Sequence, residues 1–372
     1  MNPLPLHEFH HSLNAQFAEL NGEEIVANYG DTLAEYAALR EAAGVLDLGF
    51  RSRMCLTGGD RARFLHGQVT NDINHLRPGE GCYAALVTAK GKMESDLNIY
   101  ALQDELLLDF EPGLAKKVSQ RLEKYIVADE VQVVDVAPHY GLLSVQGPKA
   151  EMAVKALGIF AEMPVKNFQS LKISDSMLGE IYLMAQSRIG NGARGATRPT
   201  GFGFDLFVPV NSLGAVADKL IAAAKSFGGR ACGWDALEMA RIEAGIPRFG
   251  IDMDESNLPL ECGIEARAVS YNKGCYIGQE VINRIHSIGH VNKELRGLRL
   301  ANDLQNMPVK GDKLFYNGKE VGYVTSAVKS PALQANLALG YVRREANALG
   351  TELKLRTATG EMKTNVVDLP FA

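Results

Sequence analysis

The chain has 372 residues, of which 46% are hydrophobic and 22% are charged, and its formal net charge is −5. These values are typical of a soluble globular protein with enough apolar residues for two or three domains. The negative charge argues against a broad nucleic-acid surface, which needs clustered lysine and arginine, but it allows a local basic pocket for a small anion.

The first part of the chain alternates helices with strands. A helix is predicted from Asp31, which can cap it, to Gly44, which can end it. The clearest hairpin has strands at 83–88 and 93–100, joined by a short turn that contains Gly91. Further strands are predicted at 45–48, 54–57, 106–110 and 131–136, with helices after Asp60 and at 114–125.

After Pro138 the alternation is repeated, and the last part of the chain then changes character. The middle segment is predicted to contain strands at 142–145, 181–185 and 204–208, and helices at 148–157, 211–227 and 234–244. Six strands without a long helix between them are then predicted at 294–300, 313–315, 320–328, 338–342, 352–356 and 364–368. We therefore predict an α+β fold of two lobes, followed by a closed or sandwich-like β domain.

Three short patterns give little functional information. Residues 190–195 match G-x-G-x-x-G, but Pro199 prevents the helix that a dinucleotide site needs, so a mobile loop is predicted there. His7, His10 and His11 are predicted to lie on a solvated N-terminal helix rather than to bind a metal. The five cysteines are odd in number and lack C-x-x-C spacing, which favours reduced thiols over a disulfide framework or a zinc site.

The densest chemical motif is Lys273-Gly-Cys-Tyr-Ile-Gly-Gln-Glu280, called the octet below. Its glycines allow a sharp turn or a close approach to a ligand, and a lysine beside Cys275 favours the thiolate. Tyr276 offers a stacking face with a polar tip. The alternative interpretation is a glycine-rich turn that leads into a helix, with Cys275 as a small buried side chain.

The octet is similar to the signature of YgfZ-type proteins, which are folate-binding relatives of the aminomethyltransferase (T-protein) of the glycine cleavage system. Segments from about residue 30 to the C-terminus resemble the same superfamily: 64–72, 88–97, 241–247, 258–261, 322–326 and 339–342. The resemblance implies two ferredoxin-like lobes and a C-terminal β-barrel around a central cavity that holds tetrahydrofolate. It implies a folate-binding domain over 1–285, with roughly 50–137 inserted as the second lobe, and a barrel over 286–372.

The resemblance also implies a carboxylate near the pterin, which orients the cofactor and stabilises developing positive charge. Asp96 matches this acid and is predicted to be catalytic and cofactor-binding; the alternative is a polar residue on the open face of a strand. A second family carboxylate is missing, because Phe202 stands at the matching position. At Phe202, a stacking or hydrophobic contact with the pterin would therefore replace the charged contact that the family carboxylate makes.

Basic and octet residues complete the predicted folate site. Arg241 and Arg284 are candidates for the glutamate tail of the folate, although Arg241 could equally brace the protein through Glu243 or another acid. Within the octet, Lys273, Tyr276 and Gln279 are predicted to bind the cofactor. Cys275 is predicted to be catalytic, with a structural role as the alternative. A single cysteine cannot hold an iron–sulfur cluster, which normally has four thiolate ligands.

Three functions follow from the resemblance. The leading hypothesis is a YgfZ-type protein that supports iron–sulfur proteins through folate-dependent one-carbon chemistry. The alternatives are a folate-dependent aminomethyltransferase that acts on a lipoyl carrier protein, and a folate-sensing scaffold without turnover. No signal peptide or bilayer-spanning stretch is seen, so a cytoplasmic protein without membrane or nucleic-acid partners is predicted.

Overall fold

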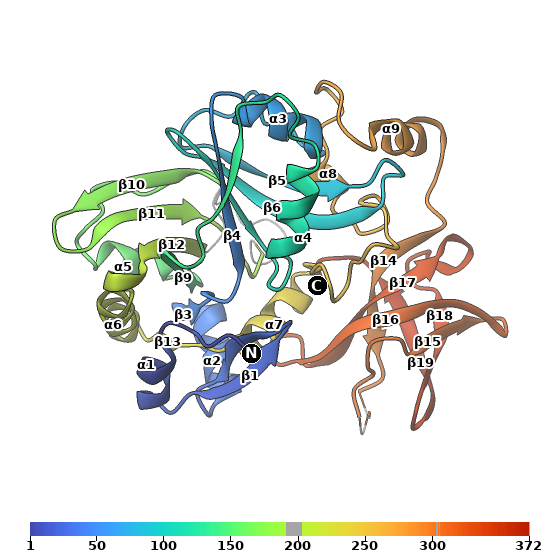
Figure 1. Cartoon of the computed structure of the whole chain (residues 1–372). Helices are drawn as coiled ribbons and strands as arrows, with labels where there is room; N and C mark the ends of the chain where they lie inside the picture. The colour runs from blue at the N-terminus through green and yellow to red at the C-terminus, as the bar shows by residue number, and fades with distance from the viewer. Residues whose placement is uncertain (191–202, 303, 305, 372) are drawn as a thin grey trace. The chain divides into compact units, whose positions relative to one another are not determined.

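The computed structural model describes residues 1–190, 203–302, 304 and 306–371 (Figure 1). Two compact units are present. Unit 1 contains Met1–His66, Asp72–Tyr83 and Leu97–Ala240, and unit 2 contains Gly67–Asn71, Ala84–Asp96 and Arg241–Ala372. The predicted α+β fold with a C-terminal barrel is confirmed. The domain boundary at 285/286 and the central cavity stay predictions.

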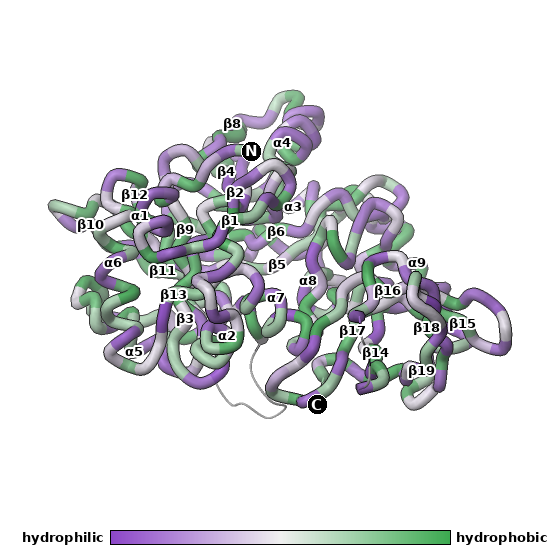
Figure 2. Tube along the Cα trace, turned by 90° about the horizontal axis from the view of Figure 1, so that it is seen from below, coloured by the Kyte–Doolittle hydropathy of each residue, from purple (hydrophilic) through white to green (hydrophobic). Residues whose placement is uncertain are grey.

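The first sheet of unit 1 has six strands and is buried on both faces. Its order is β10 (Ser170–Asp175), β11 (Gly179–Ala185), β12 (Gly203–Pro209), β9 (Tyr140–Gln146), β3 (Gly44–Asp47) and β13 (Arg230–Ala231). Only the β13–β3 pair is parallel among the pairs described. Ile181 and Leu183 pack with α5 (Ala150–Lys155) and α6 (Val210–Ser226), whereas Met184 faces the opposite core. Apolar side chains of β9 likewise face both cores, with Leu142 in one and Leu143 and Val145 in the other; Figure 2 colours the trace by hydropathy.

The second sheet has the order β5 (Gly81–Val87), β6 (Met93–Ala101), β7 (Leu106–Phe110), β4 (Ser52–Thr57) and β8 (Gln132–Asp135). Residues 84–96 of the β5–β6 hairpin belong to unit 2. Cys55, Tyr100 and Leu107 of this sheet share a core with Met184 and Phe207 of the first sheet. The helices nearby in sequence are α3 (Arg61–Gln68) and α4 (Ala115–Glu123).

The helix α2 (Thr32–Glu41) begins at the cap residue that the sequence predicts. The helix α7 (Trp234–Glu243) also agrees with its predicted range. The carboxylate of Asp31 accepts a hydrogen bond from Ala34 N at 3.0 Å, as predicted for a helix cap. Gly44, however, does not end the helix but begins β3. A Cβ atom at Gly44 would lie 2.4 Å from the side chain of Leu39, so close packing explains the glycine.

The N-terminal segment contains α1 (His7–Ser12), β1 (Gln16–Leu20) and β2 (Glu23–Asn28). The predicted helix is present, but the prediction of a solvated face is wrong for His10, which is only 2% exposed. Its Nε2 lies 2.8 Å from Asp47 Oδ2, and its Nδ1 lies 2.8 Å from the hydroxyl of Tyr29. Both ring nitrogens therefore have partners, which makes burial of the histidine favourable.

Unit 2 contains the closed barrel, in the order β14 (Lys293–Leu300), β17 (Ala335–Arg343), β16 (Lys319–Ser330), β15 (Lys313–Tyr316), β18 (Glu352–Thr357) and β19 (Gly360–Val367). Alternating residues such as Leu298, Val324 and Leu355 fill its interior. The other helices are α8 (Glu265–Ala268), α9 (Gln279–Ile288) and η1 (Arg344–Ala346). Within the described residues, no helix has the length and apolar character needed to cross a bilayer.

Candidate functional site

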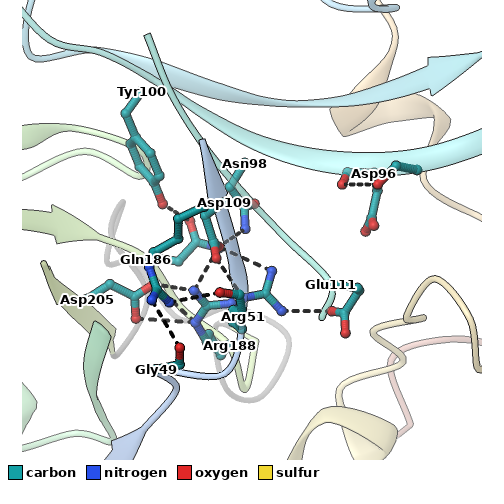
Figure 3. A network of polar contacts seen from close by, with 12 residues as sticks. Gly49, Arg51, Asp96, Asn98, Tyr100, Asp109, Glu111, Gln186, Arg188 and Asp205 are labelled. Carbon is teal, nitrogen blue, oxygen red and sulfur yellow. Dashed lines mark hydrogen bonds and ion pairs between the residues drawn. The ribbon is translucent and has the colours of Figure 1, made fainter. Parts of the chain in front are cut away.

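A cluster of charged and polar side chains lies between the two sheets of unit 1 (Figure 3). We call it the charged network; its members are Arg51, Asn98, Asp109, Glu111, Arg188 and Asp205. Asn98 and Asp109 are direct cross-strand partners on β6 and β7, so they project to the same face. Asp109 is two residues from Leu107 on β7, and Asp205 is two residues from Phe207 on β12, so each pair projects to the same face of its strand. Leu107 and Phe207 both belong to the core between the sheets. The network therefore continues that apolar core with charged groups.

Asp109 is the centre of the network. Its Oδ1 accepts from Arg51 Nε at 2.7 Å, and its Oδ2 accepts from Asn98 Nδ2 at 2.8 Å and from Arg188 Nη2 at 3.0 Å. Arg51 also donates to Glu111 Oε1 at 2.8 Å. Complete burial would raise the pKa of Asp109, but the charges and hydrogen bonds of the two arginines hold it well below its usual value. The carboxylate therefore stays ionised.

Asp205 is the second buried carboxylate and comes from the other sheet. Arg188 contacts it twice, with Nε 3.1 Å and Nη2 2.6 Å from Oδ2. Burial raises the pKa of Asp205, and the charge of Arg188 only partly opposes this effect. The two carboxylates that share Arg188 therefore have pKa values displaced in opposite directions.

Arg53, on β4, lies beside the network and is almost completely buried. It donates to the carbonyl oxygens of Arg51 and Gly49 at 2.9 and 3.0 Å, but its Nε has no hydrogen-bond partner among the described residues. Burial lowers its pKa to about 10. Three arginines thus balance three carboxylates, an arrangement suited to positioning strands rather than to binding a free anion.

The charged network was not predicted from the sequence. The sequence did contain one kind of signal, a carboxylate within an apolar strand. It occurs at Asp109 in the run 106–110 and at Asp205 in the run 204–208. Charged residues are almost never fully buried unless they are paired, so each implied a basic partner. Asp96 precedes Asn98 by two residues on β6, so the two side chains project to the same face of that strand. The structure places Asp96 there in a half-buried position.

The octet is anchored within unit 2 by Lys273. Its Nζ donates to the carbonyl oxygens of Val69 and Asn71 at 2.7 and 2.8 Å and lies 4.7 Å from the ring centroid of Tyr276. Gly278 has a φ of 86°, and a Cβ atom there would lie 2.6 Å from the carbonyl oxygen of Thr88. The ammonium and the glycine therefore hold the octet against residues 67–71 and the β5–β6 turn.

Tyr276 contributes a buried hydroxyl to the octet. The residue is 7% exposed, and its hydroxyl has no hydrogen-bond partner within the part of the chain that the structure describes. Burial raises the pKa of Tyr276 to about 12, so the hydroxyl stays protonated at neutral pH. An unsatisfied buried hydroxyl is unfavourable and is a feature that a bound polar group could correct.

The remaining octet candidates differ in their surroundings. Cys275 is exposed, so the alternative interpretation of a buried filler is wrong. Gln279 donates from Nε2 to the carbonyl oxygen of Gly274 at 3.4 Å, which closes the turn. The structure thus brings Lys273 and Tyr276 into contact and leaves the thiol open to solvent.

The two predicted tail-binding arginines differ in burial. Arg241 is buried and donates from Nη1 to Asp252 Oδ2 at 2.5 Å and from Nη2 to Ser326 Oγ at 2.9 Å. These contacts match the bracing role that the sequence left open, with Asp252 as an acid partner. Arg284 is exposed on α9. Phe202 and the loop predicted at 190–195 lie outside the described residues, apart from Gly190.

Among residues 1–190, 203–302, 304 and 306–371, no three histidine, cysteine, aspartate or glutamate side chains form a group that could hold a metal ion. His7 instead contacts Glu24, at 2.8 Å.

Comparisons with known proteins cover the whole chain. Residues 6–273 match the model of the GCVT N-terminal domain, and residues 293–372 match the glycine cleavage T-protein C-terminal barrel domain. The aminomethyltransferase of Bacillus subtilis is 26% identical over 373 residues, which cover 99% of this chain and 98% of the relative. That of Symbiobacterium thermophilum is 28% identical over 373 residues, with 99% and 96% covered.

A similar fold has been solved for the glycine cleavage system aminomethyltransferase T from Bartonella henselae. Its crystal structure matches with a TM-score of 0.87 and 24% sequence identity, over 100% of this chain and 98% of that chain. The similarity therefore extends far beyond the octet, over both the mixed domain and the barrel.

Proposed function

Because the chain belongs to the glycine cleavage T-protein family, we propose that it is a tetrahydrofolate-dependent transferase that accepts a one-carbon unit from an aminomethyl group on a lipoyl carrier protein. One observation carries this proposal: proteins named aminomethyltransferase resemble the chain over 99% of its length. The YgfZ-type function suggested by the octet is therefore the second candidate rather than the first.

The residues that would hold tetrahydrofolate include Tyr276 and Asp96. The Tyr276 hydroxyl is buried and has no partner among the described residues, so a polar edge of the cofactor would satisfy it. Asp96 offers a half-buried carboxylate on β6. Arg241 does not fit a role at the glutamate tail, since Asp252 and Ser326 already occupy its guanidinium.

Asp96 would act through charge and hydrogen bonding. When bound, tetrahydrofolate supplies the nitrogen that receives the one-carbon unit. A carboxylate beside that nitrogen orients it and stabilises positive charge that develops during transfer. Asp96 Oδ1 or Oδ2 could also accept a proton from the reacting nitrogen.

The test is a reaction of the purified protein with tetrahydrofolate and an aminomethylated lipoyl carrier. We expect equal amounts of methylene-tetrahydrofolate and ammonia, formed at a rate proportional to protein concentration. Folate binding without either product would leave the scaffold hypothesis, and absence of both binding and product would contradict a folate function.

A second candidate is support of iron–sulfur proteins, as expected for the YgfZ-type branch. The exposed thiol of Cys275, which lies between Lys273 and Tyr276 in the sequence of the octet, favours it. An accessible thiol can take part in transient exchange or capping chemistry, whereas a buried one cannot.

The two candidates respond differently to Cys275→Ala. In a strain that lacks the gene, the variant should fail to restore iron–sulfur enzyme activity if the thiol is needed, although its folate affinity is unchanged. Full restoration by Cys275→Ala would remove the thiol from the mechanism.

A further inference from the structure

The sequence contains three Asn-Gly pairs: Asn21-Gly22, Asn191-Gly192 and Asn317-Gly318. A glycine after asparagine has no Cβ atom, so its backbone nitrogen can approach the asparagine side chain more closely than that of any other residue. The pair at 191–192 lies outside the described residues. The other two pairs each form the tip of a hairpin, and the structure gives them different surroundings.

Asn317 and Gly318 form an open turn at the tip of the β15–β16 hairpin. Tyr316 pairs with Lys319, so these two residues are the whole loop, and their φ values of 49° and 78° are typical of a type I′ turn. Within the described part of the chain, neither the side-chain amide of Asn317 nor the backbone nitrogen of Gly318 has a hydrogen-bond partner. Both residues are exposed, and a Cβ atom built at Gly318 would meet nothing within 4 Å. Water and local motion therefore have free access to this turn.

Asn21 and Gly22 form a turn of similar conformation, with φ values of 53° and 86°, that is held by its neighbours. The side-chain nitrogen of Asn21 donates to the carbonyl oxygen of Pro112 at 3.2 Å. A Cβ atom built at Gly113 would lie only 2.9 Å from Asn21 Cβ, so the asparagine side chain packs against that backbone. The carbonyl oxygen of Gly22 accepts from Asn2 N at 2.8 Å. This turn must lose contacts before its side chain can move.

We propose that Asn317 is a site of spontaneous deamidation, a covalent modification that only the Asn317-Gly318 turn is free to undergo among the described Asn-Gly pairs. The backbone nitrogen of Gly318 loses its proton to water and attacks Asn317 Cγ, and the side-chain nitrogen leaves as ammonia. The product is a five-membered succinimide. Water then opens this ring at either carbonyl carbon, which gives aspartate or isoaspartate. The net reaction consumes one water and needs no oxidant or cofactor, so it is independent of the proposed function.

The isoaspartate product changes the turn in two ways. It adds a negative charge, and it inserts an extra methylene into the main chain, which then runs through the former side chain. The hairpin register that pairs Tyr316 with Lys319 is matched to a two-residue loop and not to a longer one. Since β15 also pairs with β18 and buries Leu314 in the barrel, the modification loosens one strand of the closed barrel.

The experiment follows the purified full-length protein over time at neutral pH and physiological temperature. Peptide mass spectrometry reports each site separately, with fragmentation that distinguishes aspartate from isoaspartate. In the folded protein, Asn317 should convert at least about two- to tenfold faster than Asn21, which is the factor that one hydrogen bond contributes to holding a side chain. In guanidinium chloride, where the fold is lost, the two sites should convert at similar rates.

Two variants complete the test. Asn317→Gly is the matched control, because Gly-Gly also forms a type I′ turn but has no amide to lose. Asn317→Asp gains the charge without the longer main chain. After the same incubation, wild type enriched in isoaspartate should unfold about 2–4 °C below Asn317→Asp, whereas Asn317→Gly should keep its turn.

Each outcome decides one part of the proposal. Retention of the amide at Asn317, or equal rates at Asn317 and Asn21 in the folded protein, would overturn the modification site. Equal midpoints of the incubated wild type and Asn317→Asp would overturn the effect on the β15–β16 pairing. All three proteins contain Asn191, so conversion at that position cancels in the comparison.

Discussion

Arg188 contacts Asp205 through two nitrogens, with its Nε 3.1 Å and its Nη2 2.6 Å from Asp205 Oδ2. The same Nη2 lies 3.0 Å from Asp109 Oδ2, so one guanidinium joins carboxylates from both sheets of unit 1. Removal of one member of such a buried set leaves the charges of the others without a partner. The resulting loss of stability is larger than the net contribution of the intact ion pair to folding.

Arg188→Met should therefore lower the free energy of unfolding by about 3–5 kcal/mol, because Asp109 and Asp205 stay buried with less positive charge beside them. Urea denaturation at pH 7 measures the change. Arg63→Met is the control, since Arg63 forms exposed ion pairs with Asp60 and Asp129, and no measurable loss is expected. Equal stability of Arg188→Met and wild type would contradict the role of the network.

The pH dependence of the network should have opposite signs at its two carboxylates. The pKa of Asp109 is depressed below its ordinary 3.8, so its stabilising contribution is present above that value and is lost as pH falls through the folded pKa. The stability difference between wild type and Asp109→Asn should shrink as pH falls from 5 toward 3. The pKa of Asp205 is raised by burial, so its ionised form is unfavourable in the folded protein. As pH falls toward 3.8, protonation removes this penalty, and the free energy of unfolding of the wild type should rise relative to that of Asp205→Asn. Urea titrations at several pH values test both signs.

Asp96→Asn should reduce the turnover number for methylene-tetrahydrofolate formation by about 10²- to 10⁴-fold, since an amide cannot stabilise positive charge or accept the proton. Tetrahydrofolate binding should persist. Glu94→Gln is the matched control, because Glu94 precedes Asp96 by two residues on β6 and projects to the same face of the strand. Similar losses in both variants would indicate a general effect on the strand rather than a role of Asp96.

Tyr276→Phe should raise the free energy of unfolding of the ligand-free protein by up to about 1 kcal/mol, because it removes a buried hydroxyl without a partner among the described residues. The same variant should bind tetrahydrofolate more weakly if the cofactor satisfies that hydroxyl. Thermal unfolding with and without tetrahydrofolate measures both effects. A marked loss of stability without ligand would mean that the hydroxyl has a structural partner.

Gly278→Ala should destabilise the octet more than Gly263→Ala destabilises its own turn. Both glycines have positive φ, 86° and 69°, so each substitution carries a backbone penalty of about 1–2 kcal/mol. Only at Gly278 would the new Cβ meet backbone, 2.6 Å from Thr88 O, which adds about 1–3 kcal/mol of overpacking. Comparison of the two variants by urea denaturation isolates the close contact, and equal losses would contradict it.

Local sequence signals predicted most of the fold. The cap at Asp31, the turn at Gly91 and the apolar run 106–110 each determine structure over a few residues, and the corresponding elements are present. The β1–β2 hairpin was missed although Asn21-Gly22 is a strong turn signal, with φ values of 53° and 86°. β1 is largely exposed and β2 has three consecutive buried residues, so neither strand has the regular alternation of apolar and polar residues that periodicity detects.

The site was less predictable, because its contacts join distant parts of the chain. The octet stood out by its composition, but its anchoring to Val69 and Asn71 spans about 200 residues of sequence and leaves no local pattern. The charged network likewise pairs Arg51 with Asp109 and Asp109 with Arg188. Burial of Asp109 indicates only that a partner exists, whereas its identity follows from how the two sheets pack.

Closure of the barrel between β14 and β19 determines where this protein could recruit another chain through backbone hydrogen bonds. A closed barrel presents no edge strand, so its ladder cannot be extended by a foreign strand. The open sheets of unit 1 do have edges, and β10 is the long one of the six-stranded sheet. Self-association by strand exchange, including aggregation during refolding, would therefore begin at an edge such as β10 rather than on the barrel.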